Sequence, residues 1–341
     1  MVLLQKARSL PRSTKILLGC LTSISFLLLL IRLSQFRAAI NENKSENKEL
    51  DFREINVPFL QLVPRYTIFY PWVVVTAIFC EVSVLPFIFS IVVLGVASSY
   101  IERFWGYKEV LKFVLIIGSV TNFITVITTI VSNLVRKNVL GMNKPLGGGI
   151  SYYFGFLVVF KQIIPEHNIV LFQGLTNVRV KNLPFFFLIV VSLWSLFVSK
   201  SLYPIVPSYV SFFVAFCYLR FYQSFLGDPL LPITSANVSN ESGNSLITGD
   251  ASDTFQLAEF FPSITKSYVA PIFNGCYELA CFLGIITPFN DDFIEQSNIR
   301  AQKRSEQANQ AQKSIANSVA ERRRQVALQV IEERINKGTR S

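Results

Sequence analysis

The chain has 341 residues, of which 51% are hydrophobic and 16% are charged, and its formal net charge is +10. A mean hydropathy of +0.43 is too high for a soluble domain of ordinary composition. The apolar residues form continuous blocks of roughly 15 to 23, which excludes the alternating strands of a membrane β-barrel and predicts an all-α polytopic membrane protein.

The positive charge is concentrated near the C-terminus, where ten of the 32 lysines and arginines lie between Arg300 and Arg340. A basic segment that follows a membrane domain favours anionic lipid or a protein partner over nucleic acid. The cysteines lie in apolar stretches without a CxxC pattern, so we expect buried thiols, with no disulfide framework, no metal site and no cofactor. They are Cys20, Cys80, Cys217, Cys276 and Cys281.

The first half of the chain begins with a basic segment, residues 1–15, which we expect in the cytosol. The apolar run that follows is longer than the core of a signal peptide and lacks a small-residue cleavage site, so we predict an uncleaved span. A charged loop then leads to an uncharged run that is long enough to cross a bilayer. The first three predicted spans are residues 16–31, 82–100 and 113–131.

The second half of the membrane domain follows a glycine-rich turn, Gly147-Gly-Gly149. Polar or proline-bearing joints separate three further apolar runs, which we predict as spans four, five and six. These are residues 148–164, 184–198 and 207–222, and they complete a predicted six-helix transmembrane bundle within residues 16–226.

After the bundle the composition changes. Residues 227–266 are rich in Ser, Asn, Asp and Pro, which predicts a disordered connector. Residues 267–286 are apolar but hold Pro271 and Glu278; they favour an interface helix, and a seventh span is the alternative. Residues 287–341 predict a basic amphipathic tail in the cytosol, with partner-binding residues Arg322, Arg323, Arg324, Val326, Val330 and Ile335.

The number of spans sets the topology. Six spans place both termini on one side, and the basic N-terminus and tail favour the cytosol, although the short loops carry equal numbers of lysines and arginines on the two sides. In this topology the Asn43-Lys-Ser45 sequon is luminal, so Asn43 is a possible glycosylation site.

One run resembles rhomboid-type proteins. The second predicted span closes on Glu102 and Gly106, four residues apart, as the second helix of rhomboid-type proteins does. We expect Glu102 to pair with Arg103 at the cytosolic end. The resemblance raises the alternative of an intramembrane serine protease, with Ser151 of Gly149-Ile-Ser151 as the nucleophile.

The residues that such a protease needs are absent. The only histidine, His167, lies 16 residues after Ser151, roughly 24 Å along a helix, whereas proton transfer needs ~3 Å. Counting back from Gly106, the positions of the rhomboid oxyanion residues hold Glu81, Pro86 and Ser90. A carboxylate there would repel a developing oxyanion. We therefore expect no enzyme activity, and a protease with an unorthodox base remains the alternative.

Short motifs spread along the chain resemble the transmembrane protein 115 family. They are Lys161-Gln162 with Pro165, Val178-Arg-Val180, Tyr218-Leu-Arg-Phe-Tyr-Gln223, Phe260-Phe-Pro262 and Ala320-Glu-Arg-Arg-Arg-Gln-Val-Ala-Leu328 with Glu333-Arg334. The resemblance implies a non-proteolytic multi-pass protein of the Golgi membrane, with both termini cytosolic, in retrograde Golgi-to-endoplasmic-reticulum vesicle transport. The partners implied are membrane-protein cargo, the conserved oligomeric Golgi complex as a cytosolic tether, and further copies of the chain.

Overall fold

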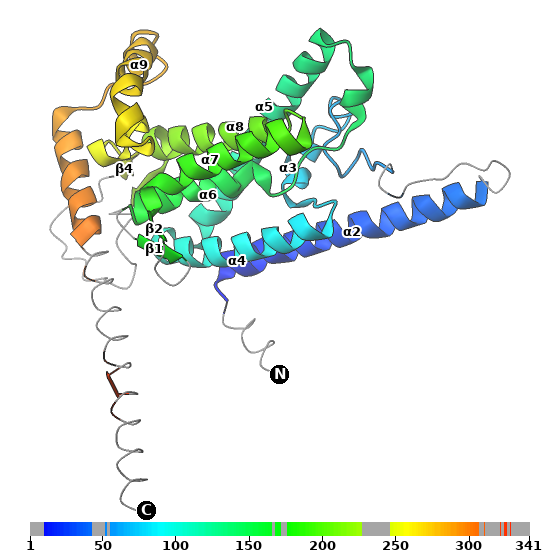
Figure 1. The fold of residues 1–341 in the computed structure, drawn as a ribbon, viewed down its shortest axis with the longest axis horizontal. Helices are drawn as coiled ribbons and strands as arrows, with labels where there is room; N and C mark the ends of the chain where they lie inside the picture. Colours follow the sequence, from blue (N-terminus) through cyan, green and yellow to red (C-terminus); the bar gives the residue numbers. More distant parts are fainter. Residues whose placement is uncertain are drawn as a thin grey trace, which may run out of the picture.

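The computed structural model describes residues 10–42, 52, 55–165, 168–171, 176–226 and 246–306, together with residues 310, 321, 324, 325 and 328. Long helices running along one common direction dominate it (Figure 1). They are α2 (Arg12–Glu42), α4 (Val84–Trp105), α5 (Tyr107–Val135), α6 (Ile150–Ile163), α7 (Leu183–Trp194) and α8 (Ile205–Cys217). The predicted all-α class of a polytopic membrane protein is confirmed.

Shorter elements join these helices. The segment before α4 holds α3 (Val73–Thr76) and η3 (Ala77–Phe79), and η4 (Val139–Asn143) follows α5. The π-helical turns η7 (Ser195–Ser199) and η8 (Tyr218–Tyr222) extend α7 and α8. Two antiparallel ladders pair β1 (Asn168–Leu171) with β2 (Thr176–Arg179), which leads to η6 (Val180–Asn182), and β3 (Ser224–Leu226) with β4 (Leu246–Thr248).

Length and composition identify the helices that can cross a membrane. Within the described residues, five are long and apolar enough, at Arg12–Asn41, Val84–Trp105, Tyr107–Val135, Val180–Ser199 and Ile205–Tyr222. The remaining expected span corresponds to α6, which is apolar but has only 14 residues. At 1.5 Å per residue such a helix measures about 21 Å, less than the ~30 Å of a bilayer core, so α6 lies within the bundle rather than bridging it alone.

The boundaries of α4 follow from its sequence. An extended Ser83 precedes it, and Pro86 lies in the first turn, where a missing N–H removes no helical hydrogen bond. The helix ends at Gly106, whose φ of +78° suits glycine, and whose N–H donates to the Glu102 carbonyl 2.9 Å away. Because α5 starts at the next residue, Tyr107, a single glycine connects the two helices.

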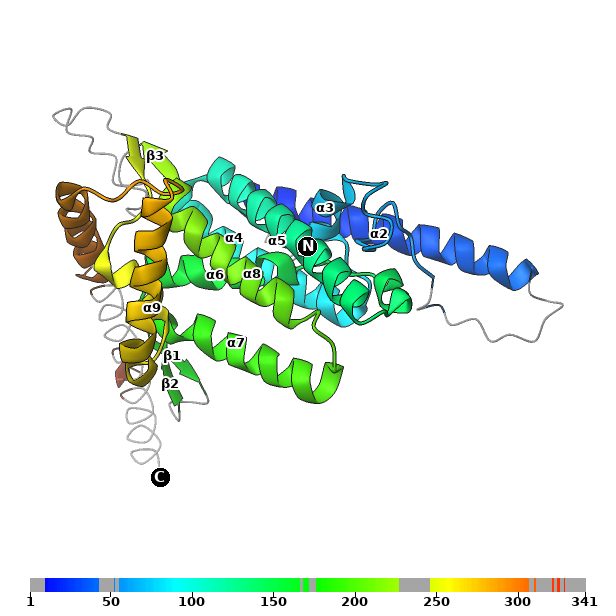
Figure 2. The same ribbon diagram turned by 90° about the horizontal axis from the view of Figure 1, so that it is seen from above.

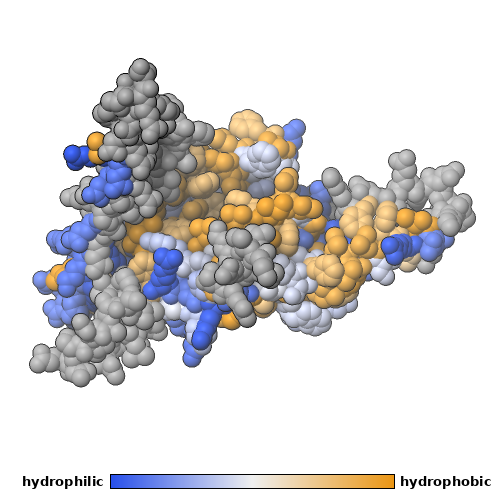
Figure 3. Space-filling view, turned by 90° about the horizontal axis from the view of Figure 1, so that it is seen from below, coloured by the Kyte–Doolittle hydropathy of each residue, from blue (hydrophilic) through white to orange (hydrophobic). Residues whose placement is uncertain are grey.

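The core of the bundle lies around α6, which packs against α5 and α8. Its large residues Tyr152 and Phe156 are almost fully buried and contact each other, with ring centroids 5.7 Å apart. Phe113 of α5 completes this aromatic group, 6.1 Å from Phe156. By contrast, Figure 3 shows hydrophobic residues over much of the outer surface, as a helix bundle in lipid requires, with hydrophilic residues gathered mainly at the end that carries the C-terminal helix.

The predicted disordered connector is wrong in its second half. Residues 227–245 lie outside the described residues, but η9 (Asp253–Phe255) and η10 (Leu257–Phe260) are ordered and packed. Phe255 and Phe260 are 2% and 1% exposed and belong to the same hydrophobic core as α8. Composition failed here because two aromatic side chains, rather than the average polarity, fix this segment on the bundle.

Helix α9 (Ser263–Phe282) covers the end of the bundle. In Figures 1 and 2 it runs across the long direction of the bundle helices, and a further helix over residues 291–306 follows it. It is not one of the five helices described above as long and apolar enough to span a membrane. Its side chains Tyr268 and Phe282 are 77% and 87% exposed. The interface position of residues 267–286 and the remaining segment boundaries stay predictions.

Candidate functional site

Ser151 lies in the first turn of α6 and is completely buried. Its Oγ donates a hydrogen bond to the carbonyl oxygen of Gly148, 3.0 Å away, so the preceding turn engages the hydroxyl proton. Gly147 and Gly148 adopt φ values of +109° and +88°, a region that favours glycine. The turn therefore holds the serine hydroxyl inside the protein.

The carboxylate of Glu81 lies at the start of the same helix. Its Oε1 accepts hydrogen bonds from the backbone N–H of Gly149 at 2.7 Å and from Ser90 Oγ at 2.5 Å. Ser90 Oγ in turn lies 2.5 Å from the hydroxyl of Tyr153. A Cβ on Gly148 would lie only 2.6 Å from Glu81 Oε2, so glycine is needed for this close approach. An acidic group thus occupies the N-terminus of α6, where anions are stabilised.

The structure brings together two of the three positions matched to the rhomboid oxyanion residues. Glu81 and Ser90 meet through their hydrogen bond, whereas Pro86 is exposed on the first turn of α4. Burial raises the pKa of the Glu81 carboxyl, and hydrogen bonds from Ser90, the Gly149 N–H and Tyr153 partly oppose that rise. The N–H of Gly149 is already bonded to a protein carboxylate, and is not free for a substrate oxyanion.

Among the described residues, the Ser151 hydroxyl makes no hydrogen bond to a histidine, lysine or carboxylate, since it donates to the Gly148 carbonyl. Helix α8 presents Ser208 and Ser211 toward the core, both fully buried. Ser211 Oγ accepts from the backbone N–H of Gly155 at 3.2 Å, and Ser208 bonds to its own helix. His167 lies outside the described residues. Within the part of the chain that the structure describes, no group of three or more His, Cys, Asp or Glu side chains could hold a metal ion.

Glu102 does not pair with Arg103 as expected. Its carboxylate caps the N-terminus of α2: Oε1 lies 3.1 Å from the backbone nitrogen of Arg12, and Oε2 lies 2.9 Å from that of Ser13. The hydroxyl of Ser13 donates to the same Oε2. The first backbone N–H groups of a helix lack helical partners and need an acceptor, which the Glu102 carboxylate supplies at the start of α2.

A second polar cluster lies where the bundle meets the segment after β4. Asp250 Oδ2 accepts from Gln162 Nε2 at 3.0 Å and forms an ion pair with Arg304 Nη2 at 3.1 Å. Arg220 Nη1 donates to the carbonyls of Asp250 and Ser252 at 2.8 and 2.7 Å. The Asp250 and Arg304 side chains are each only 6% exposed. The buried carboxylate of Asp250 thus joins α6 to the helix over residues 291–306, and Arg220 ties η8 to the backbone of the same segment.

Opposing effects act on the ionisation of Asp250. Burial favours the neutral acid, but the charge of Arg304 and hydrogen bonds from Ser252 and Gln162 outweigh it, so the pKa of Asp250 is lowered. Beside this cluster, Lys161 is 2% exposed and its Nζ lies 3.3 Å from the centroid of the Phe260 ring. The amino group of Lys161 thus lies directly over the face of the Phe260 ring.

Three of the motifs that carry the family resemblance meet in this cluster. Lys161-Gln162, Arg220 and Phe260 come from three of them. Asp250 and Arg304 were not predicted as site residues, since they lie 54 positions apart in segments whose composition predicted a connector and a tail. Asp250 lies between Gly249 and Ala251 and belongs to no periodic pattern or motif spacing, so the sequence did not indicate its role.

The structure places only a small part of the predicted tail site. Arg324 is exposed, whereas Arg322, Arg323, Val326, Val330 and Ile335 lie outside the described residues. Asn43, the possible glycosylation site, also lies outside them.

Comparisons with known proteins agree with these features. Residues 15–337 match the family described as Eukaryotic integral membrane protein (DUF1751). The chain is 32% identical over 334 residues to "Transmembrane protein 115 homolog" of Saccharomyces cerevisiae, which covers 96% of this chain and 93% of that protein. It is 26% identical over 244 residues to "Rhomboid-like protein 19" of Arabidopsis thaliana, covering 72% of this chain and 73% of the relative.

A shorter similarity links the chain to "Protein pdh1" of Schizosaccharomyces pombe, at 38% identity over 69 residues, or 20% of this chain and 27% of that protein. No solved structure matches the chain. The family match and the 32% identity both extend over nearly the whole length of this polytopic helical bundle, so the chain belongs to the transmembrane protein 115 family of eukaryotic integral membrane proteins.

Proposed function

We propose that this chain is a non-catalytic rhomboid-like protein of the Golgi membrane. It acts in retrograde Golgi-to-endoplasmic-reticulum vesicle transport, as an adaptor or cargo-recognition scaffold. The observation that carries the non-catalytic part is the hydrogen bond from the Gly149 N–H to Glu81, beside a buried Ser151. This hydrogen bond supports the proposal because a protein carboxylate takes the position where a hydrolase would stabilise an oxyanion.

The adaptor role rests on the family resemblance and on the predicted tail. In this proposal both termini face the cytosol, and the bundle binds membrane-protein cargo within the bilayer. The basic amphipathic segment from Arg322 to Ile335 docks the tethering machinery, the conserved oligomeric Golgi complex by resemblance, and copies of the chain self-associate. A helix with an apolar stripe and adjacent arginines suits a partner helix or an anionic surface.

The ordered cluster at Asp250 supports a tail whose first helix has a fixed position on the membrane domain. Because Arg304 is held in a buried ion pair, the helix over residues 291–306 is fixed to the bundle. A tether bound further along the tail would then be positioned by the membrane domain rather than by a loose linker.

The test uses full-length chain in cells that lack their own copy. Two variants are compared with the wild type: Ser151→Ala, and a truncation after residue 306 that keeps the Arg304–Asp250 pair. We expect the Ser151→Ala variant to restore fully the retrieval of an escaped endoplasmic-reticulum protein. The truncated chain should still reach the Golgi but should not restore this retrieval. Loss of retrieval in Ser151→Ala, with normal protein level and location, would support the intramembrane protease instead.

The tail is tested by co-isolation of the oligomeric tether with full-length chain in mild detergent. Replacing Arg322, Arg323 and Arg324 by glutamine should abolish co-isolation, whereas Lys337→Gln serves as the charge control. Protease protection of a C-terminal tag in sealed microsomes checks the topology, with glycosylation at Asn43 as the internal marker. A protected tag would place the tail in the lumen and contradict docking to a cytosolic tether.

A further inference from the structure

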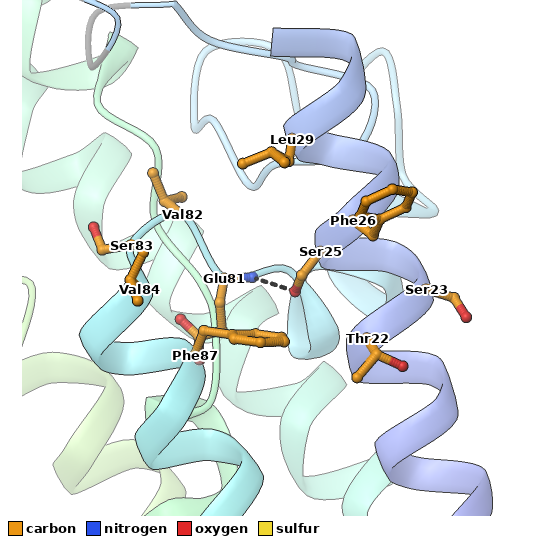
Figure 4. Close-up of a pocket in the computed structure, with 10 residues that line it drawn as sticks. All are labelled: Thr22, Ser23, Ser25, Phe26, Leu29, Glu81, Val82, Ser83, Val84 and Phe87. Carbon is orange, nitrogen blue, oxygen red and sulfur yellow. Dashed lines mark hydrogen bonds between the residues drawn. The ribbon is translucent and has the colours of Figure 1, made fainter. Parts of the chain in front are cut away.

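A groove of about 500 Å³ opens between α2 and the segment that leads into α4. Figure 4 shows Phe26 and Leu29 on one side and Val82, Val84 and Phe87 on the other, with Glu81 between them. The remaining lining residues, which carry hydroxyl groups, are Thr22, Ser23, Ser25 and Ser83.

A fixed contact defines the inner end of the groove. Ser25 Oγ donates to the carbonyl of Phe79 at 3.0 Å and accepts from the backbone N–H of Glu81 at 3.2 Å, the bond drawn in Figure 4. Ser25 therefore ties α2 to the chain on the other side. This bridge sets the separation of the two walls at the inner end of the groove, whereas Val84 on α4 lies outside the bridged segment.

The rim of the groove faces the surface that lipid would cover. Phe26 is 60% exposed and Val84 is 73% exposed. Both helices that carry them are long and apolar enough to cross the membrane. Since Val84 starts α4, the groove lies near one end of that span, at the depth where acyl chains meet headgroups. Exposed Trp72 on the preceding segment fits the same level, because tryptophan favours the interface.

The charge in the groove has one sign. Glu81 is the single ionisable residue among the lining residues, and no lysine or arginine is among them. Beside it begins α4, whose N-terminus has no side-chain cap from Ser83. The groove therefore combines apolar walls, hydroxyl groups and one carboxylate beside the N-terminus of α4. Such a site suits a ligand with an ammonium group, an adjacent anion and a hydrocarbon chain.

We propose that this groove binds one phospholipid with a primary-amine headgroup, phosphatidylethanolamine in the first instance. Its ammonium group pairs with Glu81, its phosphate lies at the start of α4, and its acyl chains run along Phe26, Leu29 and Val84. A partner helix fits less well, because a helix about 10 Å wide needs a continuous face along the span rather than a groove at one end. The proposal does not depend on the transport role.

The test measures lipid capture by wild-type, full-length chain in nanodiscs of constant phosphatidylcholine and phosphatidylglycerol content. A trace of photoreactive, diazirine-bearing phosphatidylethanolamine, phosphatidylcholine or phosphatidylglycerol is added, and the labelled peptides are identified. Labelling of residues 22–29 and 81–87 should be strongest with phosphatidylethanolamine. We expect an excess of roughly fivefold over phosphatidylglycerol, as about 1 kcal/mol from one charge contact would give.

Two matched pairs of variants sharpen the test. Thr22 and Thr128 are both exposed, and each hydroxyl bonds to its own helix four residues back at 2.9 Å, but only Thr22 lines the groove. Thr22→Phe should remove the labelling of the groove, and Thr128→Phe should leave it unchanged. Glu81→Gln should remove the headgroup preference, whereas Glu102→Gln, which changes a carboxylate at the other end of α4, should keep it.

Each result bears on the proposal directly. Equal labelling by the three lipids would overturn the proposal, and so would unchanged labelling in Thr22→Phe. A co-purified protein that occupies the groove in place of lipid would also overturn it. A monodisperse elution profile for every variant shows that lost labelling does not come from unfolding.

Discussion

Glu81 Oε1 lies 2.7 Å from the backbone nitrogen of Gly149, so an acidic side chain from the start of one membrane helix closes the N-terminus of another. The relationship joins residues 68 positions apart and places a negative charge where backbone N–H groups are free to receive it. The same contact explains the need for glycine at position 148 and the lack of an open oxyanion site. Two predictions follow from it.

The first concerns Gly148. Gly148→Ala should destabilise the protein by about 2 kcal/mol or more, because alanine is strained at a φ of +88° and its Cβ would lie 2.6 Å from Glu81 Oε2. Thermal unfolding in detergent measures the effect. Gly95→Ala is the matched control, since a Cβ there meets nothing within 4 Å. Equal melting temperatures for the two variants would mean that the Glu81 contact does not form.

The second concerns Ser151. A fluorophosphonate probe, which labels activated serines, should leave Ser151 unlabelled in native membranes, because the residue is buried and its hydroxyl is bonded to the Gly148 carbonyl. Mass spectrometry of the purified chain checks this, with an active rhomboid protease in the same membranes as the positive control. Labelling that disappears in Ser151→Ala would show an activated nucleophile and reject the non-catalytic proposal.

The third prediction concerns the buried ion pair. Arg304→Ala should destabilise the packing of the helix over residues 291–306 by about 3 kcal/mol, because the substitution leaves the carboxylate of Asp250 buried without its charge partner. Lys266→Ala is the control, since Lys266 and Glu259 pair with side chains 44% and 33% exposed, and an exposed pair contributes less than about 1 kcal/mol.

Hydrogen exchange over residues 291–306 reports the opening of that helix. Exchange that is faster in Arg304→Ala than in Lys266→Ala is expected. A double-mutant cycle with Asp250→Asn should give a coupling of at least about 1 kcal/mol, and purely additive effects would show that the two residues do not interact.

The fourth prediction concerns pH. Because the pKa of Asp250 is lower in the folded protein than its ordinary value of 3.8, its ionisation stabilises the fold at neutral pH. That contribution is complete above the unfolded pKa and is lost as the pH falls through 3.8 toward the lowered folded pKa. The melting temperature of the wild type should therefore fall more steeply below about pH 4 than that of Asp250→Asn. Parallel curves would contradict the ion pair.

The sequence predicted those features that depend on length and composition. The uncharged run from Val82 to Tyr100 predicted a membrane helix, and α4 occupies Val84–Trp105. The four-residue spacing of Glu102 and Gly106 marked the end of that helix, since the glycine takes the positive φ that terminates it. Local chemistry was enough for these.

Contacts between distant segments could not be read from the sequence. The capping of α2 by Glu102 depends on an antiparallel packing of two helices that no periodicity reveals, so the adjacent Arg103 was the natural but wrong partner. The burial of Asp250 depends on Arg220, Gln162 and Arg304 converging from three elements. In both cases one long-range contact outweighs the average composition of the segment around it.

The single glycine between α4 and α5 limits how α4 can move. A helix that is joined to its neighbour by one residue cannot slide along that neighbour, but it can rotate about the connecting residue. Over 22 residues α4 is about 33 Å long, so a swing of about 5° about Gly106 displaces the Val84 end by about 3 Å. The Glu102 cap on α2 lies within one turn of the pivot and stays intact. The width of the groove beside Glu81 is therefore the dimension that such a swing changes most.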